Sequence, residues 1–403
     1  MIFQIREELY MLPEKQLAWG LSRSCIRELA EYGAARKAEI GADKVFDFSI
    51  GNPSVPAPDC VNEAIAELIK GDSIALHGYT TAAGLMSLRQ KLAEDLNKRF
   101  DIAAKPELMY VTCGAAASLT VSLNAILLPG DEVIVIAPFF PEYRVFTEGA
   151  GGKLVVVQPK DDLQIDIDIL KAALSDRTKA VIINSPNNPS GAVYSEDNIK
   201  ALSEALKEHE EKTGETLYLI SDEPYREIVY GGISVPCPLK YYDDSIMCYS
   251  FSKSLSVPGE RIGYIVVNSR MQYAANVYAS VMGSGRSLGF VNPPSLFQRV
   301  IERCIGQTSD ISEYETNRNI LCEGLKEIGY DYIEPQGAFY LFLKSLEPDA
   351  KTFSNKAKTH ELLLVPSDDF GIPGYVRISY CVSRKTIEDS MPAFKALYEE
   401  YGH

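Results

Sequence analysis

The chain has 403 residues, of which 46% are hydrophobic and 24% are charged, and its formal net charge is −15. This composition is typical of a globular protein, and the length predicts two domains or one large and one small lobe. The negative charge disfavours nucleic acids and anionic membrane surfaces as partners, because both are polyanions. No apolar run approaches the ~20 residues that a membrane-spanning helix needs.

The eight cysteines are scattered without a C-x-x-C pair, and no two of the four histidines stand at metal-ligand spacing. In a chain of this length the cysteines indicate reduced core residues, and no structural metal is expected. The first eight residues, MIFQIREE, lack the basic-then-apolar order of a signal peptide. We therefore expect a cytoplasmic protein of enzyme size.

The middle of the chain alternates short apolar runs with amphipathic helical patterns, such as the charged stretch over 195–212. Short apolar runs bounded by turn residues are typical of strands that are buried on both faces. The predicted strands cover 109–112, 132–136, 180–184, 217–221 and 245–250. This alternation predicts an α/β fold with a largely parallel sheet, and binding residues beyond the carboxyl ends of its strands.

The two ends of the chain have a different pattern of predicted strands and helices from the middle. Predicted strands at 330–333, 337–343 and 376–380 suggest a smaller sheet flanked by helices. We expect a large domain over 56–297 and a smaller α+β domain formed by 1–55 together with 298–403.

Two of the predicted strand ends carry residues that suit a phosphate or a flat ring. The first strand is followed by Cys113–Leu119, where Ala115 and Ala116 open a helix, so that a phosphate could approach backbone amides at its positive end. Tight packing of that helix on its strand is the alternative. The second strand is followed by Phe140, whose ring could stack on a planar ligand or could be an ordinary core residue.

The next two strand ends carry polar side chains. Asn188 lies in an N-P-S-G turn that projects its amide, although a plain turn gives the same pattern. Asp222 follows the fourth strand and suits a fixed negative charge next to a protonated ring nitrogen, with Tyr225 three residues later as a phenol donor. The alternative for Asp222 is a helix N-cap.

The last of these strands leads into Ser250-Phe251-Ser252-Lys253, with Arg261 eight residues after the lysine. A lysine amine can form a Schiff base with an aldehyde, while hydroxyls and a guanidinium hold an oxyanion of the same molecule. Pyridoxal phosphate carries both groups. The alternative is a turn with a solvated lysine.

The string S-x-S-K-x4-P-G-x-R-x-G resembles the cofactor-lysine segment of class I/II aminotransferases of fold type I, and the resemblance extends from about residue 49 to residue 380. It implies a homodimer with active sites at the subunit interface and a mobile small domain. It makes Lys253 the Schiff-base lysine and Asp222 the partner of the pyridine nitrogen, and it lets Asn188 and Tyr225 hold the ring oxygen. The remaining implied cofactor contacts are the stacking residue Phe140 and the phosphate ligands Ser250, Ser252, Arg261, Ala115, Ala116 and, from the neighbouring subunit, Tyr79.

The resemblance also implies how a substrate is held. Arg377 resembles the arginine that binds the substrate α-carboxylate, for which a fork-shaped guanidinium suits better than lysine. Its alternative is a surface arginine on a strand. Gly51 lies in a turn that resembles the one closing over that carboxylate.

The implied reaction is ping-pong transamination between an L-amino acid and a 2-oxo acid. The donor displaces Lys253 from its aldimine with pyridoxal phosphate, and the freed amine acts as general base. Arg286 precedes Asn292-Pro293-Pro294 much as in a dicarboxylate-specific subgroup, with about one residue more between them, so we expect aspartate or glutamate as donors. Aromatic or other neutral amino acids, a carbon–sulfur β-lyase and a cofactor-sensing regulator are the alternatives.

Overall fold

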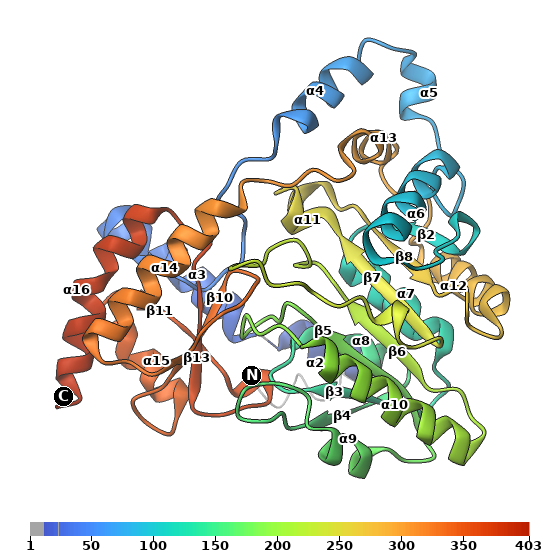
Figure 1. Cartoon of the computed structure of the whole chain (residues 1–403). Coiled ribbons are helices and arrows are strands. Elements are labelled where there is room, and N and C mark those ends of the chain that lie inside the picture. Colours follow the sequence, from blue (N-terminus) through green and yellow to red (C-terminus); the bar gives the residue numbers. More distant parts are fainter. Residues whose placement is uncertain (1–11, 23, 403) are drawn as a thin grey trace.

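The computed structural model describes residues 12–22 and 24–402 (Figure 1). Residues 1–8, on which the signal-peptide expectation rests, lie outside this part. Within the described residues no helix is both long and apolar enough to cross a membrane, and no cluster of potential metal ligands is present.

The larger sheet has seven strands in the order β2-β8-β7-β6-β5-β3-β4. Strand β8 is antiparallel to both of its neighbours, and all other adjacent pairs are parallel. Five of the strands match the predicted ones to within two residues, whereas β4 and β8 were not predicted. The strands are β2 (Met109–Thr112), β3 (Glu132–Ile136), β4 (Lys153–Val157), β5 (Thr178–Asn184), β6 (Tyr218–Asp222), β7 (Ser245–Ser250) and β8 (Gly263–Val267).

Helices cover both faces of this sheet because alternate strand residues point to opposite sides. Val133 and Val135 pack with one helix group, whereas Ile134 and Ile136 pack on the other face. The first group is α7 (Ala115–Ile126), α8 (Glu142–Gly149) and α12 (Ala274–Leu288). The opposite face is covered by α9 (Ile167–Ala173), α10 (Glu196–Thr213), α6 (Met86–Phe100) and α13 (Ser295–Cys304), and α4 (Asp59–Leu68) packs on α13.

A second unit contains an antiparallel sheet in the order β12-β13-β10-β9. A parallel pair of β1 and β11 joins the N-terminal part of the chain to the C-terminal part. The strands are β1 (Phe46–Asp47), β9 (Tyr332–Ile333), β10 (Tyr340–Lys344), β11 (Leu362–Leu363), β12 (Val365–Pro366) and β13 (Tyr375–Ser379). The helices are α3 (Cys25–Ile40), α14 (Ile311–Ile328), α15 (Ala350–Lys358) and α16 (Arg384–Glu400).

One predicted strand of this unit is wrong at its start. The prediction covered 337–343, but β10 begins only at Tyr340. Ala338 has a φ of 55°, which is incompatible with an extended strand. Gly337 approaches another segment so closely that a Cβ there would lie 2.7 Å from the Ile228 carbonyl oxygen. The segment is therefore a tight contact between two parts of the chain.

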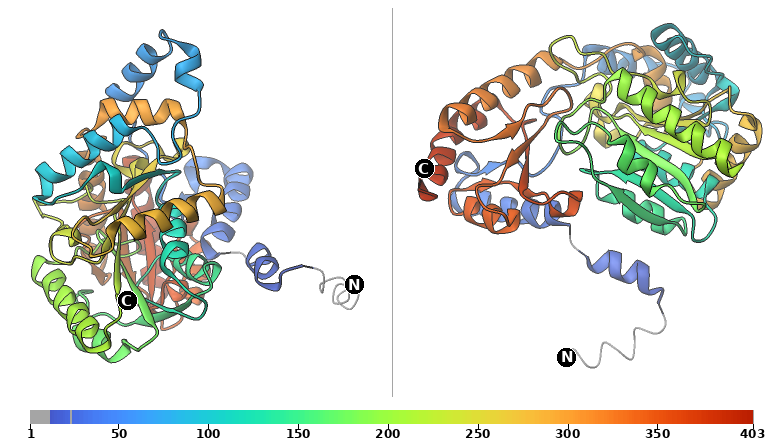
Figure 2. Two further views of the ribbon diagram at one scale, coloured as in Figure 1. Left: turned by 90° about the vertical axis from the view of Figure 1, so that its right-hand side faces the viewer. Right: turned by 60° about the horizontal axis from the view of Figure 1, so that its bottom comes forward.

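The three remaining α-helices of the described chain are short: α2 (Glu14–Leu21), α5 (Ser73–His77) and α11 (Phe251–Ser254). Helix α2 lies at the edge of the described chain and has no buried residue (Figure 2), and its Trp19 lines a cleft together with Pro141 and Arg144 beside α8. The predicted domain boundary after residue 297 falls inside α13, which packs in the same apolar cluster as α4 and α6.

Candidate active site

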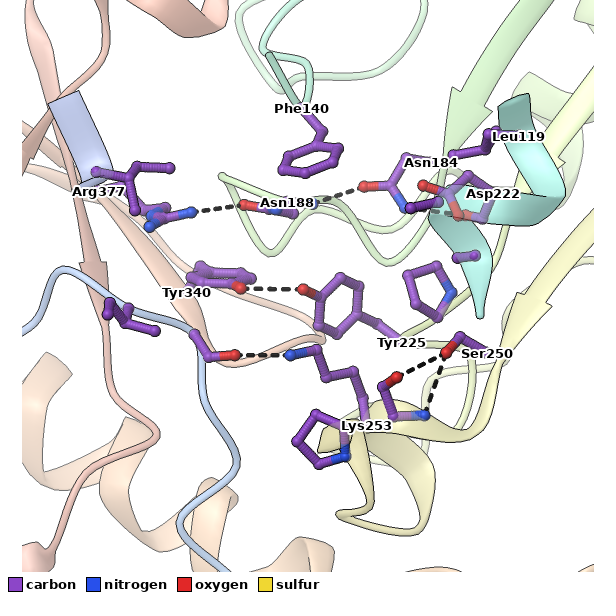
Figure 3. A pocket seen from close by; sticks show the side chains of 18 of the residues that line it. Leu119, Phe140, Asn184, Asn188, Asp222, Tyr225, Ser250, Lys253, Tyr340 and Arg377 are labelled. Carbon is purple, nitrogen blue, oxygen red and sulfur yellow. Dashed lines mark hydrogen bonds between the residues drawn. The ribbon is translucent and has the colours of Figure 1, made fainter. Parts of the chain in front are cut away.

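A cavity of about 300 Å³ lies where the carboxyl ends of the large sheet meet the turn around Gly51 and strands β10 and β13 (Figure 3). Figure 3 shows Lys253 and Phe140 on opposite sides of this cavity, and Asp222 and Arg377 at opposite ends. All but two of the predicted site residues line it. The predicted residues in the wall are Gly51, Ala115, Ala116, Phe140, Asn188, Asp222, Tyr225, Ser250, Ser252, Lys253, Arg261 and Arg377.

Asp222 is the last residue of β6 and is buried. The Tyr143 hydroxyl donates to its Oδ2 over 2.6 Å, whereas its Oδ1 is buried without a hydrogen-bond partner among the described residues. Burial raises the pKa of Asp222 to about 7, against the opposing effect of the Tyr143 hydrogen bond. No helix follows Asp222, so the N-cap alternative does not apply. The free Oδ1 suits a cationic N–H of a ligand.

Asn184 at the end of β5 holds this part of the wall together. Its Nδ2 donates to the Asp222 carbonyl oxygen over 2.9 Å, and its Oδ1 accepts from the Asn188 backbone N–H over 2.7 Å. The side chain thereby ties the strand that carries Asp222 to the turn that carries Asn188. Sequence reasoning missed Asn184, although a polar residue at a strand end is the same kind of indication that selected Asp222.

Lys253 lies on the single turn of α11, which begins after Ser250. Its Nζ donates to the Gly51 carbonyl oxygen over 2.6 Å. Burial lowers the pKa of Lys253 to about 8, and the charges of Arg261 and Arg377 act in the same direction. The amine therefore loses its proton closer to neutral pH than a solvated lysine does.

The N-terminus of α7 and the start of α11 form a cradle for an anion. The Ser250 and Ser252 hydroxyls lie 2.8 Å apart, and Arg261 Nη1 approaches the Ser252 hydroxyl at 3.5 Å. Gly114 precedes α7 with a φ of 94°, and a Cβ there would lie 2.8 Å from Arg261 Nη2. Two hydroxyls, a guanidinium and the amides of a helix N-terminus fit a phosphate group.

Arg377 enters the cavity from β13 and is almost completely buried. Its Nη1 donates to Asn188 Oδ1 over 3.0 Å, and its Nη2 donates to the Ser49 carbonyl oxygen over 2.5 Å. Its Nε has no hydrogen-bond partner among the described residues. The guanidinium is thus fixed in place with donor capacity left for a carboxylate. Because Asn188 Oδ1 already accepts from Arg377, the Asn188 Nδ2 group is left to bind a ligand.

Tyr340 is a wall residue that sequence reasoning treated only as part of a strand. Its hydroxyl lies 2.9 Å from that of Tyr225, and its ring packs 4.7 Å from the Arg377 guanidinium carbon. A Cβ at Gly51 would lie 1.9 Å from the Tyr340 hydroxyl oxygen, so this turn requires glycine. Tyr340 therefore joins the Tyr225, Arg377 and Gly51 parts of the site.

The comparisons with known proteins agree on one family. A model of the aminotransferases of class I and II matches residues 43–393. The chain belongs to this family. It is 30% identical to an aspartate aminotransferase of Thermotoga maritima over 92% of this chain and 96% of that protein. It is 32% identical to a probable aspartate/prephenate aminotransferase of Aquifex aeolicus over 88% of this chain and 91% of that protein.

Solved aminotransferase structures share the fold. An aminotransferase from Eubacterium rectale is 51% identical, with a TM-score of 0.95 over 97% of this chain and 99% of that one. An aspartate aminotransferase from Thermus thermophilus, solved with maleate, is 26% identical with a TM-score of 0.85 over 96% of this chain and 99% of that one. The predicted α/β fold, the aminotransferase family and the enzyme class are thus confirmed.

The cofactor of class I and II aminotransferases is pyridoxal phosphate. The cavity of this aminotransferase offers what that molecule needs, namely an amine for its aldehyde, an anion cradle for its phosphate and an unpaired carboxylate oxygen for its ring nitrogen. The residues present therefore fit the group.

Two predicted site residues lie away from the cavity. The side chain of Tyr79 is 96% exposed, and Arg286 is exposed in the last turn of α12. Neither lines the cavity of this single chain. Both stay predictions, and the role expected for Tyr79 requires a second subunit.

Proposed function

We propose that this aminotransferase binds pyridoxal phosphate covalently at Lys253 and transfers the amino group of aspartate or glutamate to a 2-oxo acid. The observation that carries the proposal is the free Oδ1 of buried Asp222 in the same cavity as Lys253 and the anion cradle. A ligand that fits all three must carry a carbonyl that reacts with the Lys253 amine, a phosphate for the anion cradle and a cationic ring nitrogen for Asp222, and few molecules besides pyridoxal phosphate do.

Each wall residue has a task in this proposal. Arg377 binds the α-carboxylate of the amino donor and so fixes its orientation. Lys253 Nζ removes the proton from the donor's Cα, for which a pKa near 8 is suitable at neutral pH. The ionised Asp222 keeps the cofactor's ring nitrogen protonated. When bound, the protonated ring accepts the electron pair left at Cα.

The preference for a dicarboxylic donor rests on the named relatives and on a proposed second cation. The relatives include aspartate aminotransferases of Thermotoga maritima and Bacillus subtilis. The only cationic side chains in the described wall are Lys253, Arg261 and Arg377, and each already has a task. We propose that Arg286 of a second copy supplies the cation for the donor's side-chain carboxylate.

A homodimer would explain the exposed surface around Arg286 and Tyr79. Large apolar side chains are exposed in α5 and in and after α12, which is unusual for a surface that only meets water. They are Ile74, Met282, Leu288 and Val291, with exposed fractions of 86%, 38%, 38% and 36%. We propose that this surface is the dimer interface. We also propose that the protein is cytoplasmic.

The test is the absorbance spectrum of the purified protein with pyridoxal phosphate, before and after addition of single amino acids. The lysine-bound cofactor absorbs visible light, and a true donor bleaches that band. We expect aspartate and glutamate to bleach it at lower concentration than alanine or phenylalanine, and aspartate to exchange with 2-oxoglutarate. Absence of that exchange would contradict the dicarboxylic preference. Release of pyruvate and ammonia from cystathionine without an acceptor would favour the β-lyase alternative instead.

A further inference from the structure

The helix turn that carries Lys253 has a second polar environment on its other side. A separate cavity of about 540 Å³ is lined there by Tyr249, Ser254, Glu227 and Arg99, and it shares no wall residue with the candidate active site. Helix α11 has only four residues, so few hydrogen bonds of its own fix its backbone. Contacts from outside must therefore hold the turn on which the lysine stands.

A continuous chain of hydrogen bonds runs along this rear side. The hydroxyls of Ser254 and Tyr249 lie 2.9 Å apart, and Tyr249 donates to Glu227 Oε2 over 2.8 Å. Arg99 Nη2 donates to Glu227 Oε1 over 2.9 Å. An ionised carboxylate only accepts, so the single Tyr249 proton is directed to Glu227. Ser254 must then be the donor in its contact with Tyr249.

The geometry leaves this chain little freedom to move. The Tyr249 and Ser254 side chains are both buried, and the Tyr249 ring is stacked on Tyr264 at 4.9 Å between centroids. Phe251 packs against the edge of the same ring at 5.0 Å. The Ser254 carbonyl also accepts from the Ser309 backbone N–H over 2.7 Å. The residue after Lys253 is thus held by its side chain and by its backbone.

We propose that Tyr249 is a positioning residue for Lys253, acting through Ser254 and anchored by Glu227. Ser250 and Ser252 fix α11 from the cofactor side, and the Tyr249 hydroxyl fixes it from behind. The lysine backbone then stays in place while its side chain moves between the cofactor and the substrate, so that its amine returns to the same position. This inference rests on the proposed function of Lys253.

The test compares Tyr249→Phe with Tyr264→Phe. Both variants keep the aromatic stack and lose one hydroxyl group, but the Tyr264 hydroxyl, in the wall of the second cavity, makes no hydrogen bond to a described residue. The first measurement is the rate at which cofactor-free protein forms the visible band after addition of pyridoxal phosphate. The second is the separate determination of kcat and KM for the amino donor in the cofactor-saturated enzyme, at a temperature where each variant is folded.

We expect Tyr249→Phe to slow formation of the band and to lower kcat by ~10- to 100-fold, as misplacement of a reacting group does, with KM little changed. Tyr264→Phe should match the wild type in both measurements. Ser254→Ala removes the other end of the contact and should repeat the Tyr249→Phe pattern, including in the case that Tyr249→Phe does not fold.

Three results would overturn the inference: a Tyr249→Phe variant with wild-type rate and kcat, equal losses in Tyr249→Phe and Tyr264→Phe, or a loss of thermal stability alone. A wild-type protein that forms no visible band would instead refute the proposed function of Lys253.

Discussion

Asp222 lies inside the protein with one carboxylate oxygen bound to Tyr143 and the other open to a ligand. Its pKa is about 7 in the folded chain, against an ordinary value of 3.8. The folded state therefore keeps a proton that the unfolded state has already lost, and its stability falls as the pH rises from about 4 to about 7.

This gives a prediction for the cofactor-free protein. Between pH 5 and pH 8 the free energy of unfolding of the wild type should fall relative to that of Asp222→Asn, which has no such proton to lose. Urea unfolding at a series of pH values measures the difference. Saturation with pyridoxal phosphate should weaken the trend, because a cationic ring nitrogen favours the ionised carboxylate. Parallel curves for the two cofactor-free proteins would contradict a raised pKa.

The residues that were predictable from the sequence are those that follow strands or belong to a local pattern. Asp222 and Asn188 follow apolar runs, and Lys253 with Arg261 forms one short motif. Tyr143 and Tyr340 were missed because their tasks come from partners far along the chain, 79 and 115 residues away. No local pattern encodes such a contact.

At the scale of elements, the turn from β2 into α7 shapes the anion cradle. Gly114→Ala places a Cβ 2.8 Å from Arg261 Nη2 and forces a non-glycine residue to a φ of 94°. We expect the variant to lose about 1 kcal/mol or more of stability and to bind pyridoxal phosphate ~10-fold or more weakly, because one charge-assisted contact is disturbed.

The matched control for this prediction is Gly259→Ala, two residues before Arg261. A Cβ at Gly259 meets nothing within 4 Å, and its φ is not in the left-handed region. Equilibrium dialysis of cofactor-free protein gives both dissociation constants. Equal cofactor affinity of Gly114→Ala and the wild type would show that the close approach of Gly114 to Arg261 is not needed.

Which elements were predictable follows from how each one is stabilised. The central strands β3, β5, β6 and β7 are apolar runs buried on both faces, so their composition alone indicates them. Strands β1 and β11, of two residues each, were not predicted, because they exist only through pairing between segments far apart in the sequence, whereas β9 lies within the predicted 330–333. The predicted start of β10 at residue 337 was wrong because contacts with another segment of the chain, and not the local sequence, determine the conformation of residues 337–339.

At the scale of the whole molecule, we propose two domains, one around the seven-stranded sheet and one formed by both chain ends. The sequence suggested 56–297 for the larger one, and the packing of α13 favours extending it to Cys304. The site takes residues from both units, since Asp222 and Lys253 stand on the large sheet and Arg377 on the small one. Relative motion of the units would therefore open or close the cavity.

The proposed dimer is tested by hybrids of two inactive chains, one with Lys253→Ala and one with Arg286→Gln, isolated through two different tags. If Arg286 acts in the neighbouring site, one site of each hybrid has an intact lysine and an intact arginine. Aspartate turnover should then return to roughly half of the wild-type value per dimer, as expected when one of two symmetric sites is intact. A hybrid without recovered turnover would show that Arg286 acts in its own subunit, and full aspartate turnover of the Arg286→Gln homodimer would show that Arg286 does not act at all.

The central claim is that Lys253 carries the cofactor. Borohydride reduction of the protein loaded with pyridoxal phosphate makes the link permanent, and mass spectrometry of its peptides locates the modified residue. The account predicts that the modification occurs at Lys253, and that Lys253→Ala lacks both this modification and transaminase turnover. Modification of a different lysine with full turnover in Lys253→Ala would contradict the account.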